Sequence, residues 1–475
     1  MPIPSHKTKI VATIGPASNS PEMLERLIRA GMNVARLNFS HGDFSGHAGV
    51  IERLRAAECA TGRQVAVMAD LPGPKMRLGK IAPEPILLRT GDGITLTSEQ
   101  VIGNTQRISM SFEALPRVVK PGDRLSLNDG LVQIVVENAA GNDVRCRVTA
   151  GGELSSHKGL NLPGINLGIS AFTDHDRACL AFALEHGVDA VSQSFVETAA
   201  DIAAVREAAE ALGKHPFIIA KIERAGALDH FAEILEAADG VMIARGDLGV
   251  EVPLEEMAIT QKRLMAQAIL AGRPVITATQ MLESMVSNRL PTRAEATDVA
   301  NAILDGTDCI MLSGESAMGK YPEESVEMLA RIAAFTEPRR PRHTLRELHD
   351  LCNSQPLDTV AETMAFVVEH ALDTVPCAAV FVPTRTGTTA RMISRFKPSP
   401  WVAAVSHDHG VCRALAFSYG VFPVEINGYP ENWKAFARDW VREQGLSGTG
   451  AMLAAGPSER HPQDNHRLEF ITFGQ

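Results

Sequence analysis

The sequence has 475 residues, of which 45% are hydrophobic and 21% are charged, and its formal net charge is −10. This length predicts about two to four domains with large buried cores. The acidic balance argues against nucleic acid as a main partner, because backbone phosphates are bound by concentrated positive charge.

Cysteine spacing and hydropathy exclude two further classes of protein. The seven cysteines are scattered and form no C-x-x-C pair, which disfavours a disulfide framework or a structural zinc site and favours a reducing compartment. The first residues run directly into a strand-like segment, and no apolar stretch reaches about 18 residues. We therefore expect a cytoplasmic protein that is neither secreted nor bound to a membrane.

Short apolar runs with polar carboxyl-terminal ends alternate with amphipathic stretches over the first two thirds of the chain. Alternation of this kind predicts parallel strands covered by helices, and eight such units predict an α/β fold of the (β/α)8 barrel type. In such barrels the active site lies at the carboxyl ends of the strands. The expected strands cover residues 9–15, 33–40, 64–71, 189–195, 217–223, 240–248, 274–280 and 309–316.

Two further domains are expected. Residues 72–157 contain short, closely spaced strand signals with turns such as "KPGD", which predict an inserted all-β domain that acts as a lid on the barrel mouth. The barrel then comprises residues 1–71 and 158–335. Alternating strand and helix signals return later and predict a C-terminal open α/β domain over residues 344–475, after a linker rich in proline and arginine at 336–343.

The run "FIIAKIER", residues 217–224, is apolar but ends in opposite charges. Lys221 and Glu223 project to the same side because they are two residues apart in a strand. A pair of this kind by itself is more often a structural ion pair. However, the next strand ends in "ARGDLG", which places Asp247 at the neighbouring strand end. Two carboxylates there suit one Mg²⁺ or Mn²⁺, and the lysine would stabilise a negative transition state.

Other strand ends add polar groups to the same mouth. Alone, His41 is typical of a structural histidine, and Thr279 of an ordinary strand residue. Together with the charged pair they indicate a metal-assisted reaction on a small phosphorylated or carboxylated molecule. These groups are Arg36, Asn38, Ser40 and His41 after the second strand and Thr277, Thr279 and Gln280 after the seventh.

At this point the motifs resemble those of the pyruvate kinase family. They include "KTKIVATIGPAS", "MNVARLNFSHG", "KGLNLPG", "IIAKIERAGAL", "MIARGDLGVEVP" and "PTRAEATDVANAILDGTDCIMLSGESAMGKYP". The resemblance runs from about residue 7 to about residue 335 and continues more loosely through the last domain. It implies phosphoryl transfer from phosphoenolpyruvate to ADP, giving pyruvate and ATP at the end of glycolysis, in a homotetramer.

The resemblance also implies roles for the residues at the mouth. Glu223 and Asp247 would bind Mg²⁺ or Mn²⁺, and Lys221 would stabilise the moving phosphoryl group. The amides of Gly246 and Asp247 would bind the substrate carboxylate. Thr279 would contact the substrate where its carbon is protonated. Such a site works by positioning and charge neutralisation.

The remaining contacts implied by the resemblance lie on the phosphate and nucleotide side. Arg36 would bind the phosphate of the substrate. The residues implied for the nucleotide are Asn38, His41, Arg77 and Lys158, with Arg77 and Lys158 at the hinges of the lid.

One stretch departs from the family pattern. Residues 70–77 read "DLPGPKMR", whereas the family usually has D-T-K-G-P-E-I-R, so that Lys75 stands where a glutamate is usual. Two unit charges about 4 Å apart repel by about 4 kcal/mol at an effective dielectric of 20, so a lysine would exclude a second cation. We expect Lys75 to replace K⁺ and turnover to be potassium-independent, as in the lysine-containing branch of the family. The alternative is that Lys75 points into solvent. The family's monovalent-cation site corresponds to Asn38, Ser40, Asp70 and the carbonyl of Leu71.

The last domain carries a threonine- and glycine-rich loop before a helix. Amide groups at a helix start attract anions, and in the family this loop binds phosphorylated allosteric effectors. A plain threonine cap of the helix is the alternative interpretation. The loop consists of Thr384, Arg385, Thr386, Gly387, Thr388 and Thr389.

Two other functions stay open at this stage. One is a metal-dependent barrel aldolase or lyase acting on pyruvate enolates, which the β-lid and Lys221 disfavour. The other is an inactive scaffold of the same fold, which is disfavoured by the presence of all the charged residues at the mouth. Substitution of Lys221 by methionine would separate the scaffold from the kinase.

Overall fold

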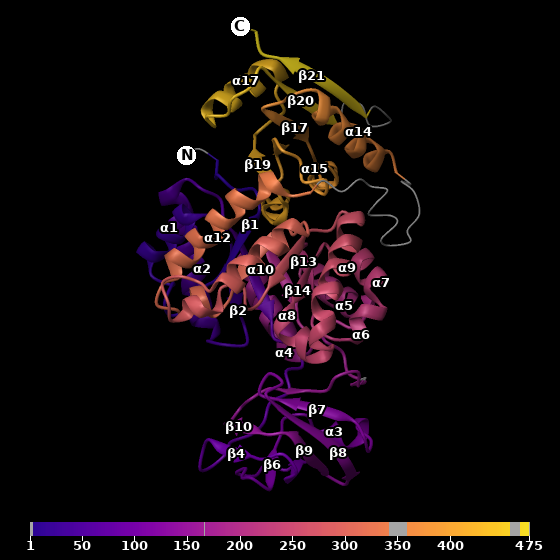
Figure 1. The fold of residues 1–475 in the computed structure, drawn as a ribbon. Coiled ribbons are helices and arrows are strands. Elements are labelled where there is room, and N and C mark those ends of the chain that lie inside the picture. Colours follow the sequence, from indigo (N-terminus) through magenta and orange to yellow (C-terminus); the bar gives the residue numbers. More distant parts are fainter. Residues whose placement is uncertain (1–2, 166, 342–358, 457–465, 475) are drawn as a thin grey trace.

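The computed structural model describes residues 3–165, 167–341, 359–456 and 466–474. Figure 1 shows three bodies in a row, with the barrel in the middle, a β-domain at one end and the C-terminal α/β domain at the other. Within the described ranges, no helix is both long and apolar enough to cross a membrane.

The barrel is closed and all-parallel, with strand order β1-β16-β15-β14-β13-β12-β3-β2. All eight expected strands form, so the predicted (β/α)8 fold is confirmed. Its interior is filled with buried apolar side chains such as Val11, Met68 and Ile276. The strands are β1 (Lys9–Thr13), β2 (Met32–Asn38), β3 (Ala66–Leu71), β12 (Ala190–Gln193), β13 (Phe217–Ile222), β14 (Gly240–Ala244), β15 (Val275–Ala278) and β16 (Cys309–Leu312).

The barrel helices begin at recognisable caps. Ser20 accepts a hydrogen bond from the amide of Met23, and Pro21 follows at the first helical position. Thr173 and Asp176 form a capping box. The α-helices are α1 (Pro21–Ala30), α2 (Phe44–Thr61), α4 (Asp174–Glu185), α5 (Ala199–Ala211), α6 (Gly226–Asp229), α7 (Phe231–Ala237), α8 (Arg245–Glu251), α9 (Met257–Leu270), α10 (Arg293–Leu304), α11 (Gly314–Ala317) and α12 (Pro322–Thr336). Short 3₁₀ helices are η1 (Leu254–Glu256), η2 (Glu283–Val286) and η3 (Glu337–Arg339).

The β-domain is inserted after β3 and therefore lies at the carboxyl ends of the barrel strands. It has a six-stranded sheet, in the order β11-β7-β8-β9-β5-β6, and a two-stranded sheet, β10-β4. Residues 160–161 pair with β7, so the sheet continues past residue 157. The elements are β4 (Ile86–Leu88), β5 (Gly93–Thr97), β6 (Arg107–Ser109), α3 (Leu115–Val118), β7 (Arg124–Leu127), β8 (Val132–Ala140), β9 (Asp143–Ala150), β10 (Gly152–Leu154) and β11 (Leu160–Asn161).

The C-terminal domain is an open sheet in the order β19-β18-β17-β20-β21, parallel except for β21. The linker expected at 336–343 begins as helix, because Thr336 ends α12 and η3 follows; residues 342 and 343 lie outside the described residues. The elements are α14 (Val360–Thr374), β17 (Ala379–Pro383), α15 (Thr388–Ser394), β18 (Trp401–Ser406), α16 (His409–Ala414), η4 (Leu415–Phe417), β19 (Val421–Glu425), α17 (Trp433–Glu443), β20 (Gly450–Ala455) and β21 (Arg467–Thr472).

This domain packs against the amino ends of the barrel strands. The rings of Phe217, at the start of β13, and Phe417 stack with centroids 5.2 Å apart. Lys397 Nζ lies 2.5 Å from Oδ1 of Asp308, just before β16. The β-domain and the C-terminal domain thus cover opposite ends of the barrel.

Candidate active site

Lys221 is the central charge of the barrel mouth. Its Nζ donates to Ser194 Oγ at 2.7 Å and lies 2.9 Å from Glu223 Oε1 and 3.2 Å from Asp70 Oδ1. Its side chain is only 10% exposed. Lys221 and Glu223 do project to the same side, as the pleat of β13 requires. The ammonium is therefore fixed by three oxygen partners from three strand ends.

Asp70 connects Lys221 to Arg36. One oxygen, Oδ2, accepts from Arg36 Nε at 2.8 Å, and the other, Oδ1, accepts from Ser192 Oγ at 2.7 Å. Burial disfavours the charged carboxylate, but the positive charges of Lys221 and Arg36 outweigh it and hold the pKa of Asp70 at about 2. Arg36 also donates from Nη1 to Thr13 Oγ1 at 2.8 Å. Asp70 is thus ionised at neutral pH and holds both cations in place.

Glu223 is the buried carboxylate nearest to the lysine. Its Oε2 accepts a hydrogen bond from the amide of Phe195 at 2.8 Å. Burial raises the pKa of Glu223, Lys221 opposes this shift, and the negative charge of Asp247 adds to it. The two carboxylates therefore lie close enough to repel one another.

The carboxylates of Glu223 and Asp247 are oxygen ligands of the kind that fits a hard divalent ion. Within the described ranges, no group of three or more His, Cys, Asp or Glu residues could hold a metal. Mg²⁺ commonly binds through one or two carboxylates and takes its other ligands from substrate and water. Glu223 and Asp247 would provide that number of carboxylate ligands.

Thr279 lies opposite the start of α8 in a left-handed backbone conformation. Its φ is 70°, and that of Gln280 is 54°. Non-glycine residues adopt this region at a cost, and such residues cluster at functional sites. The Thr279 hydroxyl accepts a hydrogen bond from the amide of Gly246 at 2.8 Å. A Cβ atom at Gly246 would lie 3.3 Å from Thr279 Cγ2, so glycine allows this close approach.

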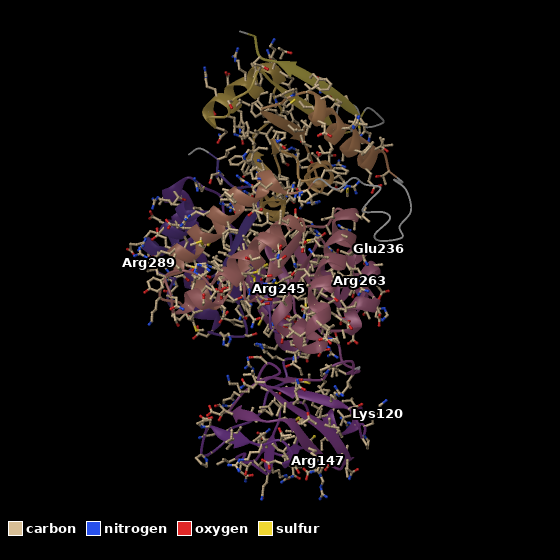
Figure 2. The ribbon with its side chains drawn as sticks, in the orientation of Figure 1. Lys120, Arg147, Glu236, Arg245, Arg263 and Arg289 are labelled. Atoms are coloured by element: carbon tan, nitrogen blue, oxygen red, sulfur yellow. The ribbon has the colours of Figure 1, made fainter. Side chains whose placement is uncertain are left out.

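Arg245 is a residue that sequence reasoning missed. Its Nη1 donates to Asp298 Oδ1 at 2.8 Å and its Nη2 donates to the carbonyl of Thr279 at 2.9 Å. Figure 2 places it within the barrel domain, in contrast to Lys120 and Arg147 in the β-domain. The only signal in the sequence was its position before Gly246. Ser194 was missed as well, because a serine at a strand end carries no distinctive pattern.

A cleft of about 200 Å³ lies between the barrel mouth and the β-domain. It is lined by His41, Arg77 and Lys158, which are expected on the nucleotide side, and by Lys75, which is expected to replace K⁺. Lys75 is exposed, and burial together with the charges of Arg77, Lys75 and Arg36 lowers the pKa of His41. The lining residues are His41, Lys75, Met76, Arg77, Asp129, His157, Lys158, Gly159, Leu160, Asn161, Phe195 and Asp247.

Asn38 does not line this cleft. Its side-chain oxygen accepts from the amide of Ser40 at 3.0 Å, within the turn after β2. Leu71 is fully buried at the end of β3, and Asp70 is occupied by Arg36 and Lys221. The four positions of the expected monovalent-cation site thus lie on adjacent strand ends.

The threonine-rich loop of the last domain forms a closed turn. Gly387, with φ of 80°, donates its amide to Thr384 Oγ1 at 2.9 Å. The hydroxyls of Thr386 and Thr388 lie 2.9 Å apart, and Arg391 donates to the carbonyl of Thr386 at 2.8 Å. Arg385 and Thr388 are exposed at this turn.

Fold and site together define a barrel enzyme whose buried lysine and carboxylates lie beneath a β-domain. Comparison with known proteins identifies the family. The family model "Pyruvate kinase, barrel domain" matches residues 5–326, and "Pyruvate kinase, alpha/beta domain" matches residues 362–456. The chain belongs to the pyruvate kinase family, whose members are phosphotransferases.

Individual relatives support this assignment over most of the chain. A pyruvate kinase of Thermococcus litoralis is 50% identical over 89% of this chain and 89% of its own length. A pyruvate kinase of Geobacillus stearothermophilus is 42% identical over 88% of this chain and 71% of its own. The crystal structure of a pyruvate kinase from Cryptosporidium parvum has a TM-score of 0.91 at 34% identity, covering 99% of this chain and 97% of that one.

Proposed function

We propose that this chain transfers the phosphoryl group of phosphoenolpyruvate to ADP with the help of Mg²⁺ or Mn²⁺, giving pyruvate and ATP as in glycolysis. The observation that carries the proposal is Lys221, buried and held between Asp70 and Glu223 beside the lid cleft. Phosphoryl transfer needs fixed positive charge at this kind of position, because the transition state spreads negative charge over three oxygens.

The residues have different roles in the phosphoryl transfer. Lys221 and Arg36 neutralise the phosphoryl oxygens while the bond from phosphorus to the enol oxygen breaks and a bond to a β-phosphate oxygen of ADP forms. The side chains of Glu223 and Asp247 would hold the divalent ion, which would supply further positive charge to the transfer. Asp70 takes no part in bond making and fixes the two cations.

The enolate left after transfer needs a proton on carbon. Thr279 is the proposed group at that carbon, directly or through water. In the structure its hydroxyl accepts from the amide of Gly246. A substrate carboxylate bound to the amides of Gly246 and Asp247 would compete for this donor and release the hydroxyl toward the substrate. Catalysis and carboxylate binding would then be linked through one hydrogen bond.

ADP would lie in the cleft between barrel and lid. His41, Arg77 and Lys158 line this cleft, and the basic side chains suit phosphate oxygens. Asn38 is proposed to act on the same side from the carboxyl end of β2. Arg77 and Lys158 lie on the two chain segments that enter and leave the lid, so closure of the lid would bring them toward the nucleotide.

The proposal is tested by pyruvate formation from phosphoenolpyruvate and ADP with Mg²⁺ in tetramethylammonium buffer, with and without K⁺. We expect equal rates in both buffers, because Lys75 would supply the charge that K⁺ supplies elsewhere. A rate that appears only with K⁺ would retain the kinase and remove the proposed role of Lys75. No rate in either buffer, from folded protein, would contradict the kinase itself.

Lys75→Glu is expected to create a potassium requirement. The substitution reverses the charge and restores the residue that is usual in the family, so the variant should be slowed roughly tenfold or more without K⁺ and rescued by it. The measurement is the K⁺ titration of the steady-state rate. The control is Lys80→Glu, an exposed lysine outside the lining of the cleft, which should show no K⁺ response.

Arg245→Lys is expected to lower kcat roughly 10-fold to 100-fold with a smaller change in KM. Lysine keeps the charge but cannot bind Asp298 and the carbonyl of Thr279 at the same time, so Thr279 would lose its support. The matched variant Arg263→Lys, on the outer helix α9 and labelled in Figure 2, should be unchanged. Equal kcat in the two variants would refute a positioning role for Arg245.

Three further features belong to this proposal. A homotetramer is supported by exposed apolar side chains on the barrel helices, such as Ile259 and Phe335, and light scattering on the purified protein tests it.

The turn at Thr384–Thr389 is proposed to bind a phosphorylated effector. A cytoplasmic location is supported by the free cysteines of the described residues.

A further inference from the structure

A small cavity lies at the opposite end of the barrel from the active site, where the C-terminal domain docks. Its volume is about 10 Å³, which is the space of one water molecule or one monatomic ion. The barrel and the C-terminal domain both contribute to its wall. The polar residues of the wall are Arg273, Asp308, Arg391, Ser394, Arg395, Lys397 and Ser418.

Arg395 brings unpartnered donors to this cavity. Its side chain is 3% exposed, and its Nη1 donates to the carbonyl of Leu270 at 2.8 Å and lies 3.3 Å from Glu362 Oε1. In the part of the chain that the structure describes, Nε and Nη2 of Arg395 have no hydrogen-bond partner. The same holds for the hydroxyl of Ser418, which is 1% exposed. Buried donors left without acceptors are costly, so an acceptor is expected between them.

The charge balance around the cavity favours an anion over water. Four cationic side chains line it, and Asp308 is the single carboxylate among the lining residues. Both oxygens of Asp308 are in use, because Oδ1 contacts Lys397 Nζ at 2.5 Å and the amide of Tyr419 at 2.9 Å, while Oδ2 accepts from the amide of Val275 at 3.1 Å. Glu362 is not among the lining residues; its Oε1 lies 3.3 Å from Arg395 Nη1, and its Oε2 accepts from the amide and hydroxyl of Thr359 at 3.1 Å. Positive charge is therefore in excess within a buried site.

The neighbouring cations have other fixed contacts that keep them in place. Arg273 donates from Nε to the carbonyl of Leu235 at 2.9 Å and from Nη2 to that of Glu236 at 3.1 Å. Figure 2 shows Glu236 on the barrel side that faces the C-terminal domain. Burial lowers the pKa of Arg391, Arg395 and Lys397, the effect expected when positive charges are enclosed without full compensation.

We propose that this cavity binds one monatomic anion of the size of chloride, which accepts from Nε and Nη2 of Arg395 and from the hydroxyl of Ser418. The anion offsets the surrounding cations, and it lies between groups of both domains, so it stabilises the docking of the C-terminal domain on the barrel. Phosphate has five heavy atoms and is too large for the cavity. The proposed ligands of the anion are not part of the turn at Thr384–Thr389, although Arg391 lines the cavity and also donates to the carbonyl of Thr386.

The identity of the occupant is tested by diffraction from crystals of the full chain soaked in bromide. An anomalous peak within hydrogen-bond distance of Arg395 Nη2 and Ser418 Oγ is expected, because bromide exchanges with chloride. A peak that refines as a water molecule only, without anomalous signal, would overturn the proposal.

Thermal unfolding tests the stabilising effect. In chloride, the midpoint should lie roughly 2–4 °C above that in gluconate at equal ionic strength, because gluconate is too large to enter. Ser418→Ala removes one donor and should at least halve this difference, whereas the exposed Ser287→Ala should keep it. Arg395→Gln should abolish it; if that variant does not fold, Ser418→Ala decides. Bromide seen in crystals without any chloride dependence of unfolding would mean an adventitious ion only and would refute the site.

Discussion

Lys221→Met is expected to lower kcat for pyruvate formation by about 10³-fold or more while KM for phosphoenolpyruvate changes less. The ammonium is held by three oxygen partners in a site from which water is largely excluded, and charge preorganised in this way contributes most in the transition state. Steady-state kinetics with a coupled assay measures the loss. A scaffold function of the same fold would be unaffected.

The fold of this variant has to be checked, because removal of one partner of a buried ion network costs about 3–5 kcal/mol. Asp70 would keep Arg36, but Glu223 would lose its nearest cation. Lys221→Arg retains the charge and should fold better, yet the planar guanidinium cannot reproduce the same contacts, so a loss of about 10²-fold remains. Lys120→Met, on the exposed surface of the lid and labelled in Figure 2, is the control with full activity. Folded Lys221→Met protein within tenfold of the wild-type rate would eliminate the proposed mechanism.

Glu223→Gln is expected to separate stability from activity. Loss of the carboxylate should raise the Mg²⁺ concentration for half-maximal rate at least tenfold and lower kcat by about 10²-fold. The midpoint of thermal unfolding should stay the same or rise. Burial and the charge of Asp247 raise the pKa of Glu223, so the fold disfavours its carboxylate relative to the unfolded chain, and the neutral amide removes this cost while Lys221 keeps Asp70 as a partner.

Glu251→Gln provides a matched control for this experiment. Glu251 is also buried, and burial and the charge of Asp247 also raise its pKa, but its cationic partner is Arg224 at 3.4 Å and not Lys221. The Mg²⁺ concentration for half-maximal rate of the Glu251→Gln variant should equal that of the wild type. An unchanged Mg²⁺ requirement in Glu223→Gln would show that the divalent ion is held elsewhere.

The sequence alone indicated the barrel because its signals are local. Each strand is a short apolar run that ends in polar residues, and burial on both faces of a parallel sheet leaves such runs continuous. The spacing of Lys221 and Glu223 also determined that they share one face of β13, since the side-chain period of a strand is two. The long insertion after residue 71 was sufficient to predict a separate β-domain.

Local sequence patterns could not predict which residues from distant segments are in contact. Nothing near Asp70 in the sequence shows that it would bind both Arg36 and Lys221, which are 34 and 151 residues away. The support of Thr279 by Arg245 depends on two neighbouring strand ends that meet only when the barrel closes. The cationic cavity depends on residues of two domains, none of which stands out in its own segment.

The sequence by itself thus determined the order of elements, the three bodies and the residue types at the barrel mouth, since these follow from hydrophobic period and length. Only the tertiary structure decided which charges lie together: Asp70 binds two cations, Glu223 lies near the like charge of Asp247, and Arg395 has no acceptor for two of its donors among the described residues. The physical reason is that electrostatic interactions depend on distance and burial, which barrel closure and domain docking set for residues far apart in the chain.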